Sequence, residues 1–471
     1  MLFPTIDFAL FFALVFPVTW ALNRVNSVKK LFLVAASYLF YASWNWHFCL
    51  LLLVSSTLAF AAGLLIDLSG GRLKRLVLWG AIAADLAVLG YFKYINFLSA
   101  EVANVSGLIG TPIDLGTYEM ALPVAISFIT FHAISYVVDV YDGRVKATRS
   151  YDDLLLYIAF FPHLVAGPIV RAELFLPQLA GPSDSRSIRL GDSMRLILGG
   201  LFKKVVLASH LATLFVDPLY VTPASQTSFD LWIGLYAYAL VIYCDFSAYT
   251  DIAIGIANLL GYRFPQNFDQ PYRALSVAEF WRRWHMTLSN WLRQYVYIPL
   301  GGNRHGSLMT ARNLLITMLL GGLWHGAGLQ FIVWGGLHGI ALVATRLLAP
   351  IAEPFARRFP TGFKVAAWVL TFHFVCVAWV FFRAGTLDDA LAYLTTLVSM
   401  TGGASTLTPF VALVLAAAAL THLVPAHLYV ALGAAYERLG WTGKILVPAA
   451  VIYGVVLVAP LGVPPFIYFQ F

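Results

Sequence analysis

Charged residues are scarce in this sequence: only 11% of its 471 residues are Asp, Glu, Lys or Arg, whereas 60% are hydrophobic. Soluble domains carry about 25% charged residues, so this composition excludes an ordinary soluble protein. Apolar runs long enough to cross a bilayer recur along the whole chain. The sequence therefore predicts an all-α polytopic membrane protein. Its net charge of +7 indicates basic cytoplasmic loops rather than binding of nucleic acid.

Cysteine pairs and the signatures of common hydrolases are also lacking. Cys49, Cys244 and Cys376 each stand alone in an apolar run, so their spacing indicates neither a disulfide nor a metal site. The sequence contains no H-E-x-x-H, no G-x-S-x-G and no phosphate-binding loop, which leaves metalloprotease, serine hydrolase and P-loop functions without support. We expect no metal and no permanently bound cofactor.

The positive charges are grouped, and their spacing sets the topology that we expect. Basic clusters lie at 24–30, 72–75 and 144–149, with two apolar runs between each cluster and the next. Two crossings return the chain to the side that it left, so all three clusters are expected to face the cytoplasm. The run 154–170 is broken by Pro and Gly, which favours a re-entrant or interfacial segment. We predict about eleven or twelve spans in one domain that covers residues 1–471.

The most basic part of the chain, 262–313, contains a pattern typical of a helix at the membrane surface. Within 276–300, aromatic and leucine side chains recur every three or four positions, whereas Arg282 and Arg283 fall elsewhere. We therefore expect an interfacial helix under the cytoplasmic leaflet. A surface anchor explains the aromatic residues and the arginines, but it gives no reason for His285 between them.

Residues 313–341 are almost wholly apolar and yet hold two histidines in glycine-rich frames, His325 in GGLWHG and His338 in GGLHG. Ionisable groups are unfavourable at bilayer depth and usually face a protein interior or a wet cavity, and glycine permits close helix contact or a chain break there. We predict two helical halves, too short for full spans, with His325 at the turn between them. A functional role is favoured for His325, whereas for His338 a hydrogen-bonded packing role is equally open.

Another apolar run holds Asp245, Ser247 and Asp251. Carboxylates inside a membrane helix need partners, and we expect arginines of the 262–293 region or an imidazole. These polar residues either bind neighbouring helices to one another, which is the favoured interpretation, or line a cavity. The same two interpretations apply to two histidines in other apolar runs, His132 and His163.

One buried imidazole and a second at the cytoplasmic face, with no cysteine nucleophile and no metal cluster, favour group transfer. Histidine can take a proton from a hydroxyl near neutral pH while a reactive donor is held beside it. Basic residues at the cytoplasmic mouth suit a donor that carries phosphate. The residues alone leave open a membrane acyltransferase, a membrane glycosyltransferase, or a transporter with a histidine relay.

Five stretches carry the most distinctive motifs of the chain: 122–143, 160–179, 243–255, 267–304 and 321–339. They resemble the membrane-bound O-acyltransferase family, in its bacterial branch that includes alginate O-acetyltransferase and the D-alanyl transfer protein of teichoic acid. They follow the family's order, and the succession of RRWH and GGLWHG is the most specific feature. The N-terminal opening also resembles that branch, whereas the part after the motif-bearing core, 120–340, matches only in hydropathy.

The resemblance implies a ring of about 11–12 tilted transmembrane helices, with re-entrant or interfacial helices, around a central funnel. The family's invariant catalytic histidine falls on His325, and its supporting histidine falls on His285. A further set is expected to bind the donor or to line the tunnel: Arg282, Arg283, Trp284, Trp324, Asp245, Ser247, Asp251 and His338.

The resemblance also implies the substrates. The donor would be an acyl thioester at the cytoplasmic face, with acetyl-coenzyme A expected, and the acceptor a cell-envelope polysaccharide such as alginate. We expect a multi-pass protein of the cytoplasmic (inner) membrane, in contact with lipids, with a periplasmic partner that completes the O-acetylation. Two alternatives stay open: D-alanyl transfer from a carrier protein, and a non-enzymatic transporter of an envelope precursor.

Overall fold

A computed structural model describes residues 1–118, 121–460, 462 and 464–467 of the chain. Within these residues the chain forms helices joined by loops and turns, and it contains no β-strand. The predicted all-α class is therefore confirmed.

The helices gather into two compact units. The N-terminal unit comprises Met1–Ile188 and Ile256–Pro265, and the C-terminal unit comprises Arg189–Gly255 and Gln266–Phe471. This division does not test the expectation of a single acyltransferase domain, which stays a prediction.

Six helical segments are long and apolar enough to cross a membrane, by length and composition. One bent pair of helices raises the number to seven if it counts as one crossing, and three further apolar helices are shorter. The predicted polytopic class is confirmed, but fewer helices of spanning length occur in the described part of the chain than the eleven or twelve expected. Several apolar runs bend or end before they reach about 20 residues, and hydropathy alone does not reveal this. The six segments are Phe48–Leu68, Gly71–Leu108, Leu190–Val221, Ser228–Leu259, Leu329–Arg358 and Pro360–Arg383.

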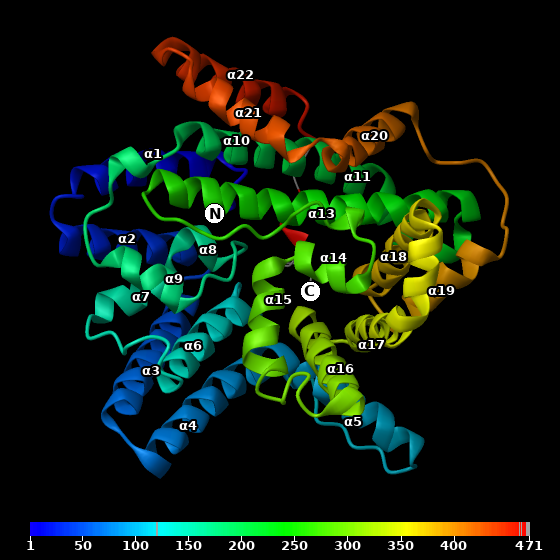
Figure 1. Cartoon of the computed structure of the whole chain (residues 1–471), viewed down its shortest axis with the longest axis horizontal. Coiled ribbons are helices and arrows are strands. Elements are labelled where there is room, and N and C mark those ends of the chain that lie inside the picture. The colour runs from blue at the N-terminus through cyan, green and yellow to red at the C-terminus, as the bar shows by residue number, and fades with distance from the viewer. Residues whose placement is uncertain (119–120, 461, 463, 468–471) are drawn as a thin grey trace. The chain divides into compact units, whose positions relative to one another are not determined.

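In the N-terminal unit, α6 packs against both α3 and α4, which follow one another in sequence and also pack against each other (Figure 1). The predicted break in the run 154–170 is present, because α7 ends at Ala159 and a short α8 is followed by a buried loop. The helices are α1 Ile6–Ala21, α2 Asn26–Ala42, α3 Phe48–Leu68, α4 Gly71–Leu89, α5 Ile95–Leu108, α6 Ile126–Tyr141, α7 Tyr151–Ala159, α8 Phe161–Leu164 and α9 Ala172–Phe175.

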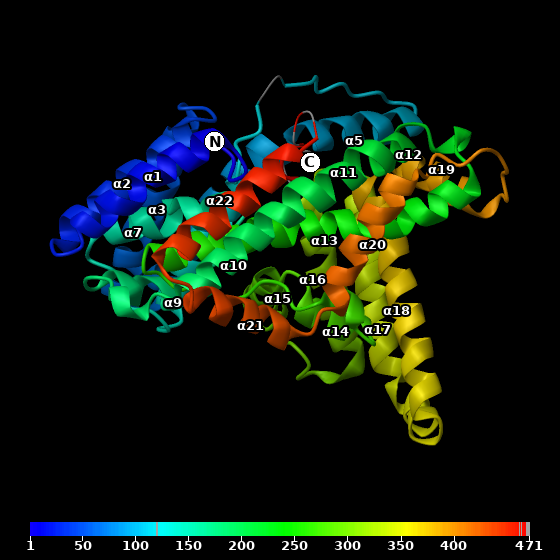
Figure 2. The same ribbon diagram turned by 90° about the horizontal axis from the view of Figure 1, so that it is seen from above.

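The C-terminal unit contains most of α13, which runs beside α10 in both views (Figures 1 and 2). A Cβ on Gly200, the penultimate residue of α10, would lie 2.8 Å from the carbonyl oxygen of Ala248, so only glycine permits this approach. α17 and α18 also lie side by side (Figure 2). The α-helices of this unit are α10 Leu190–Leu201, α11 Ser209–Leu211, α12 Asp217–Val221, α13 Ser228–Leu259, α14 Val277–Arg283, α15 Met286–Leu292, α16 Gly306–His325, α17 Leu329–Arg358, α18 Pro360–Arg383, α19 Leu387–Val398, α20 Pro409–Leu423, α21 Ala426–Glu437 and α22 Trp441–Leu457. Three π-helical segments accompany them: Phe202–Ala208, Ala212–Val216 and Arg293–Tyr297.

The prediction of one continuous interfacial helix within 276–300 is wrong. The segment forms two short helices, α14 and α15, which are separated by Trp284 and by His285 in a left-handed conformation. Its aromatic face is buried against protein: Trp281 packs on Trp334 of α17, and Trp284 packs on Trp379 of α18. A 3–4 periodicity identifies a buried face, but it cannot tell whether lipid or protein covers that face.

The prediction of two halves too short to span, between 314 and 345, is wrong for the second half: α17 is one of the six segments of spanning length, whereas α16 is not among them. α16 has 20 residues and begins at Gly306, whereas α17 has 30 residues and continues to Arg358. Arginine is a good helix former, so a basic cluster marks a polar environment and does not mark a helix end. The expected close contact is present, because a Cβ on Gly335 of α17 would lie 2.4 Å from the carbonyl oxygen of Met318 in α16.

Candidate active site

His325 is the last residue of α16 and lies where the chain turns toward α17, as predicted. Its side chain is buried, with 3% exposed, and it is surrounded by aromatic rings. The centroids of Trp324, Trp334 and Phe382 lie 4.8, 4.9 and 5.0 Å from the centroid of the imidazole. The structure thus holds an imidazole at a helix end in an environment of low polarity.

His285 lies at the bend between α14 and α15 and is fully buried. Its ring lies edge-to-face with Phe246 of α13 at 4.6 Å, and 6.0 Å from the ring of Trp324. Trp324 is therefore a neighbour of both His285 and His325. The two histidines singled out by the sequence, 40 positions apart, come together on one indole ring.

His285 is held in place by Asn267, a residue that the sequence analysis did not single out. The Asn267 side-chain oxygen lies 3.2 Å from Nδ1 of His285, and it accepts hydrogen bonds from the backbone N–H and the hydroxyl of Thr287. Burial lowers the pKa of His285 from 6.5 to about 3, so its imidazole is neutral at pH 7. A neutral imidazole can accept a proton, which a general base must do.

His338 is also fully buried, but its surroundings differ. The indole N–H of Trp281 donates to Nδ1 of His338 at 3.2 Å, and the rings of Trp334 and Phe374 lie 4.8 and 5.3 Å away. An indole N–H can only donate, so Nδ1 carries the lone pair and the proton of the neutral ring is on Nε2. His338 therefore already uses its basic nitrogen in a contact within the protein.

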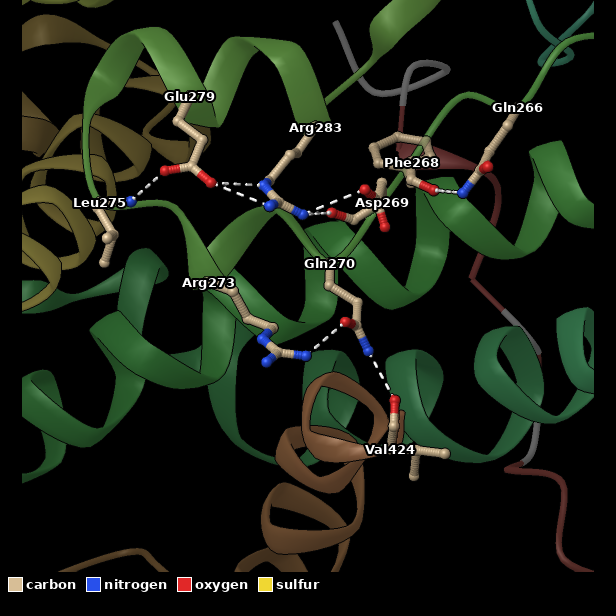
Figure 3. A network of polar contacts seen from close by, with 9 residues as sticks. All are labelled: Gln266, Phe268, Asp269, Gln270, Arg273, Leu275, Glu279, Arg283 and Val424. Atoms are coloured by element: carbon tan, nitrogen blue, oxygen red, sulfur yellow. Dashed lines mark hydrogen bonds and ion pairs between the residues drawn. The ribbon is translucent and has the colours of Figure 1, made fainter. Parts of the chain in front are cut away.

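Arg282, Arg283 and Trp284 directly precede His285 and were expected to bind the donor or to line the tunnel. Their environments differ. Arg283 bridges Glu279 at 3.0 Å and Asp269 at 3.1 Å, so its charge is engaged within the protein (Figure 3). Trp284 is buried among aromatic rings. Arg282 is exposed, and of these three residues it is the one placed to meet a ligand from outside.

A polar network keeps the segment before α14 in position (Figure 3). Gln270 donates to the carbonyl oxygen of Val424 at 2.7 Å and accepts a hydrogen bond from Arg273 at 2.8 Å. The backbone N–H of Leu275 donates to Glu279 at 2.8 Å. These contacts anchor the same segment that carries Asn267.

The prediction for the carboxylates of α13 is wrong as to their partners. Asp245 pairs with Lys204 and Asp251 pairs with Lys203, both at 2.6 Å, rather than with arginines of 262–293 or with an imidazole. Ser247 accepts a hydrogen bond from Lys203 at 2.8 Å. The two lysines, in the π-helical segment Phe202–Ala208, were missed. Two cations inside an apolar run are themselves a signal, because charges within the membrane need counter-ions.

Residues near the C-terminal end lie against the Lys204–Asp245 pair. The backbone N–H of Ile467 donates to Asp245 at 2.9 Å, and Lys204 donates to the carbonyl oxygen of Pro465 at 3.2 Å. A cavity of about 30 Å³, lined also by Asp217 and Arg383, lies beside this pair. It has room for one or two water molecules and not for a substrate.

In the N-terminal unit, His132 and His163 stack on one another, with ring centroids 4.7 Å apart, and both are fully buried. Nδ1 of His132 lies 2.9 Å from the carbonyl oxygen of Phe128, and Nε2 of His163 lies 2.9 Å from that of Tyr157. Carbonyl oxygens only accept hydrogen bonds, so these two nitrogens carry the ring protons.

Across the described residues, no three His, Cys, Asp or Glu side chains form a group that could hold a metal ion. The site thus contains the neutral imidazole of His285 and the imidazole of His325, which share the neighbour Trp324 and are surrounded by aromatic rings. Such an arrangement suits proton transfer from a hydroxyl in a site that limits access of water.

Residues 146–383, which include Asn267, His285 and His325, match the model of the membrane-bound O-acyltransferase family. The chain is 41% identical to the probable alginate O-acetylase of Pseudomonas aeruginosa, over 77% of this chain and 68% of that protein. It is 38% identical to the peptidoglycan O-acetyltransferase of Helicobacter pylori, over 79% and 74% of the two chains. It is 27% identical to the teichoic acid D-alanyltransferase of Bacillus subtilis, over 65% and 77%.

Proposed function

The chain belongs to the membrane-bound O-acyltransferase family, and from this premise we propose that it transfers acetyl groups for O-acetylation of a cell-envelope polysaccharide such as alginate. It is a multi-pass membrane protein and an O-acyltransferase. Its family membership gives no support to the alternative of a non-enzymatic transporter.

The choice of acetyl over D-alanyl rests on the relatives. Proteins named as O-acetylases or O-acetyltransferases are 38 to 41% identical to this chain, whereas D-alanyltransferases are 27 to 32% identical. The names of both groups of acetylating relatives specify a polymer as acceptor, alginate or peptidoglycan. Alginate is the proposed acceptor because several relatives with that name match at about 40% identity. D-alanyl transfer from a carrier protein is the second candidate.

The observation that carries the proposal is His325, buried at the end of α16 and sharing the neighbour Trp324 with His285. We assign His325 as the general base. Its imidazole takes the proton of an acceptor hydroxyl, and the hydroxyl oxygen forms a bond to the carbonyl carbon of the acetyl thioester. The carbon–sulfur bond then breaks, and the leaving thiolate takes the proton from the imidazolium. His285 is the supporting imidazole beside this centre.

The donor is proposed to be acetyl-coenzyme A, which reaches the protein from the cytoplasm. Arg282, exposed beside the His285 bend, is the residue best placed for a contact with its phosphates. The acceptor polymer lies outside the cytoplasm, so the protein works in the inner membrane and passes the acetyl group to a periplasmic partner. Support for this direction comes from the expected topology and from the chemistry of the donor.

The test is the O-acetyl content of envelope polysaccharide in cells that carry His325→Ala, after the amount and insertion of the protein have been checked. We expect loss of the ester with normal polymer export. His132→Gln, a change in the N-terminal unit, is the matched control and should retain the ester. Unchanged ester in His325→Ala would contradict the assignment and would point to His285 or His338. Loss of polymer export itself would favour the transporter function.

A further inference from the structure

The side-chain oxygen of Asn267 can be identified without ambiguity, although amide oxygen and nitrogen are often hard to tell apart. The backbone N–H of Thr287 points at this atom from 3.1 Å, and a backbone N–H can only donate. The atom must therefore be the amide oxygen, an acceptor. The hydroxyl of Thr287 donates to the same oxygen at 2.9 Å.

The identity of this oxygen fixes the proton on the neighbouring histidine. Nδ1 of His285 lies 3.2 Å from the Asn267 oxygen, and two acceptors cannot form a hydrogen bond with each other. Nδ1 must therefore carry the ring proton, and in a neutral ring Nε2 then carries the lone pair. Nε2 is buried and has no hydrogen-bond partner among the residues that the structure describes.

We infer that Asn267 is a positioning residue that holds His285 as the Nδ1–H tautomer, so that the Nε2 lone pair is free to accept a hydrogen bond and support the general base His325 during acyl transfer. The use assigned to the lone pair rests on the proposed function. The tautomer itself does not, because it follows from the contacts of Asn267 alone.

The backbone around His285 supports a fixed orientation. His285 has φ 41° and ψ 54°, a left-handed conformation that is unfavourable by about 1 kcal/mol or more for a residue with a Cβ. Asn267 holds the chain directly after it, because the N–H of Met286 donates to the Asn267 backbone oxygen at 2.9 Å. Strained conformations of this kind persist where the surroundings enforce them, and they gather at functional sites.

A second clamp holds the chain directly before His285. The N–H of Asp269 donates to the carbonyl oxygen of Arg283 at 2.9 Å, and the Arg283 guanidinium pairs with the Asp269 carboxylate at 3.1 Å (Figure 3). Residues 267–269 are thus bonded to the chain on both sides of the histidine. Both the ring orientation of His285 and its tautomer are set by this short segment.

His338 provides an internal contrast within the same unit. Its Nδ1 accepts from the Trp281 indole, so its neutral ring is the Nε2–H tautomer, opposite to that of His285. An imidazole whose lone pair is already engaged cannot serve as a base without breaking that bond. The two histidines should therefore differ in any measurement that reports which ring nitrogen carries the proton.

The test is ¹⁵N NMR of the full chain, labelled at its histidines and held in lipid nanodiscs near pH 7. The His285 signals are identified by their loss in His285→Gln. We expect a protonated Nδ1 and an unprotonated Nε2 in the wild type, and a changed tautomer ratio in Asn267→Ala. Asn313→Ala, which removes another buried amide, is the control and should leave the His285 signals unchanged.

The wild-type spectrum alone can overturn the inference, even if Asn267→Ala does not fold. A protonated Nε2 on His285 would contradict it, and so would a tautomer that Asn267→Ala leaves unaltered. In Asn267→Asp an acceptor oxygen remains for Nδ1–H and for Thr287. This variant should therefore retain the wild-type tautomer.

Kinetics separate this inference from the proposed function. With acetyl-coenzyme A as donor, Asn267→Ala should lower kcat by about 10- to 100-fold, as is typical of groups that orient a functional imidazole, with little change in KM. Asn267→Asp should recover part of the loss. If the tautomer changes but kcat does not, the role proposed for His285 fails while the positioning by Asn267 stands. If kcat falls without a change of tautomer, the positioning account fails.

Discussion

Two pairs of buried histidines, one in each unit, invite comparison. His132 and His163 of the N-terminal unit stack directly on one another, and each donates its ring proton to a backbone carbonyl. His285 and His325 of the C-terminal unit are both neighbours of Trp324. His285 is held by an asparagine side chain and occupies a strained backbone conformation, and His325 ends a helix.

Burial of an imidazole does not by itself indicate function. His132 lies within the regular helix α6, and a side chain tied to the carbonyl four residues earlier in its own helix serves packing. The C-terminal pair lies at a helix end and at a bend, where the backbone is not committed to a regular helix. An unfavourable backbone conformation that is held in place by side-chain hydrogen bonds is the stronger indication of a functional site.

The largest expected effect tests whether His285 and His325 act as one unit. His325→Gln should lower kcat with acetyl-coenzyme A by about 10³-fold, within the usual range for loss of a general base. The double variant with His285→Asn should be scarcely slower than His325→Gln alone, because groups that act together are not additive. Purified variants assayed for kcat provide the measurement. If the reductions in kcat of the two single variants multiply in the double variant, His285 and His325 contribute independently and do not act as one unit.

The next effect separates activity from stability at His285. His285→Asn should lower kcat by about 10²-fold, since the supporting imidazole is lost. The thermal midpoint should change little, because asparagine, like histidine, is among the non-glycine residues that tolerate the left-handed conformation. Differential scanning fluorimetry in detergent would report the midpoint. A large fall in the midpoint would mean that His285 is a structural residue like His132.

A smaller effect is expected in the dependence of stability on pH. Burial lowers the pKa of His285 from 6.5 in the unfolded chain to about 3. Between these values the unfolded chain binds a proton that the folded chain does not, so stability is lost as the pH falls below about 6.5. The slope contributed is at most about 1.4 kcal/mol per pH unit. Thermal midpoints across this range should fall less steeply in His285→Asn, and parallel curves would contradict the assigned pKa.

The smallest effect is expected in the N-terminal pair. His132→Gln can still donate to the carbonyl oxygen of Phe128, so kcat should stay within about twofold of the wild type. His163→Gln should behave similarly with respect to the carbonyl oxygen of Tyr157. Steady-state rates, normalised to the amount of folded protein, provide the measurement. A loss comparable to that of His325→Gln would erase the distinction between the two pairs.

Much of the fold and the two main histidines could be predicted from the sequence, because composition and motif order are local properties. The scarcity of charge established a helical membrane protein, and the glycine frame of His325 predicted a turn and a close contact between α16 and α17. The RRWH and GGLWHG motifs brought His285 and His325 into one hypothesis.

The remaining features depend on contacts between distant parts of the chain, and the sequence does not display them. The aromatic pattern at 276–300 correctly identified a buried face, but the bend at His285 is enforced by Asn267, 18 residues earlier. Asp245 forms an ion pair with Lys204 rather than with an arginine, because the π-helical segment Phe202–Ala208 lies next to α13 at this position. Residue type indicated that a partner was needed, but only the packing of the helices identified it.

In the proposed mechanism, the histidines of the C-terminal unit carry out acyl transfer and those of the N-terminal unit do not. The most direct test is the release of coenzyme A from acetyl-coenzyme A by purified wild type, His325→Gln and His132→Gln, measured side by side in nanodiscs. We predict that the wild type and His132→Gln consume the donor at similar rates, while His325→Gln does so at about one thousandth of that rate. Equal rates for His325→Gln and the wild type, or equal loss in both variants, would contradict it.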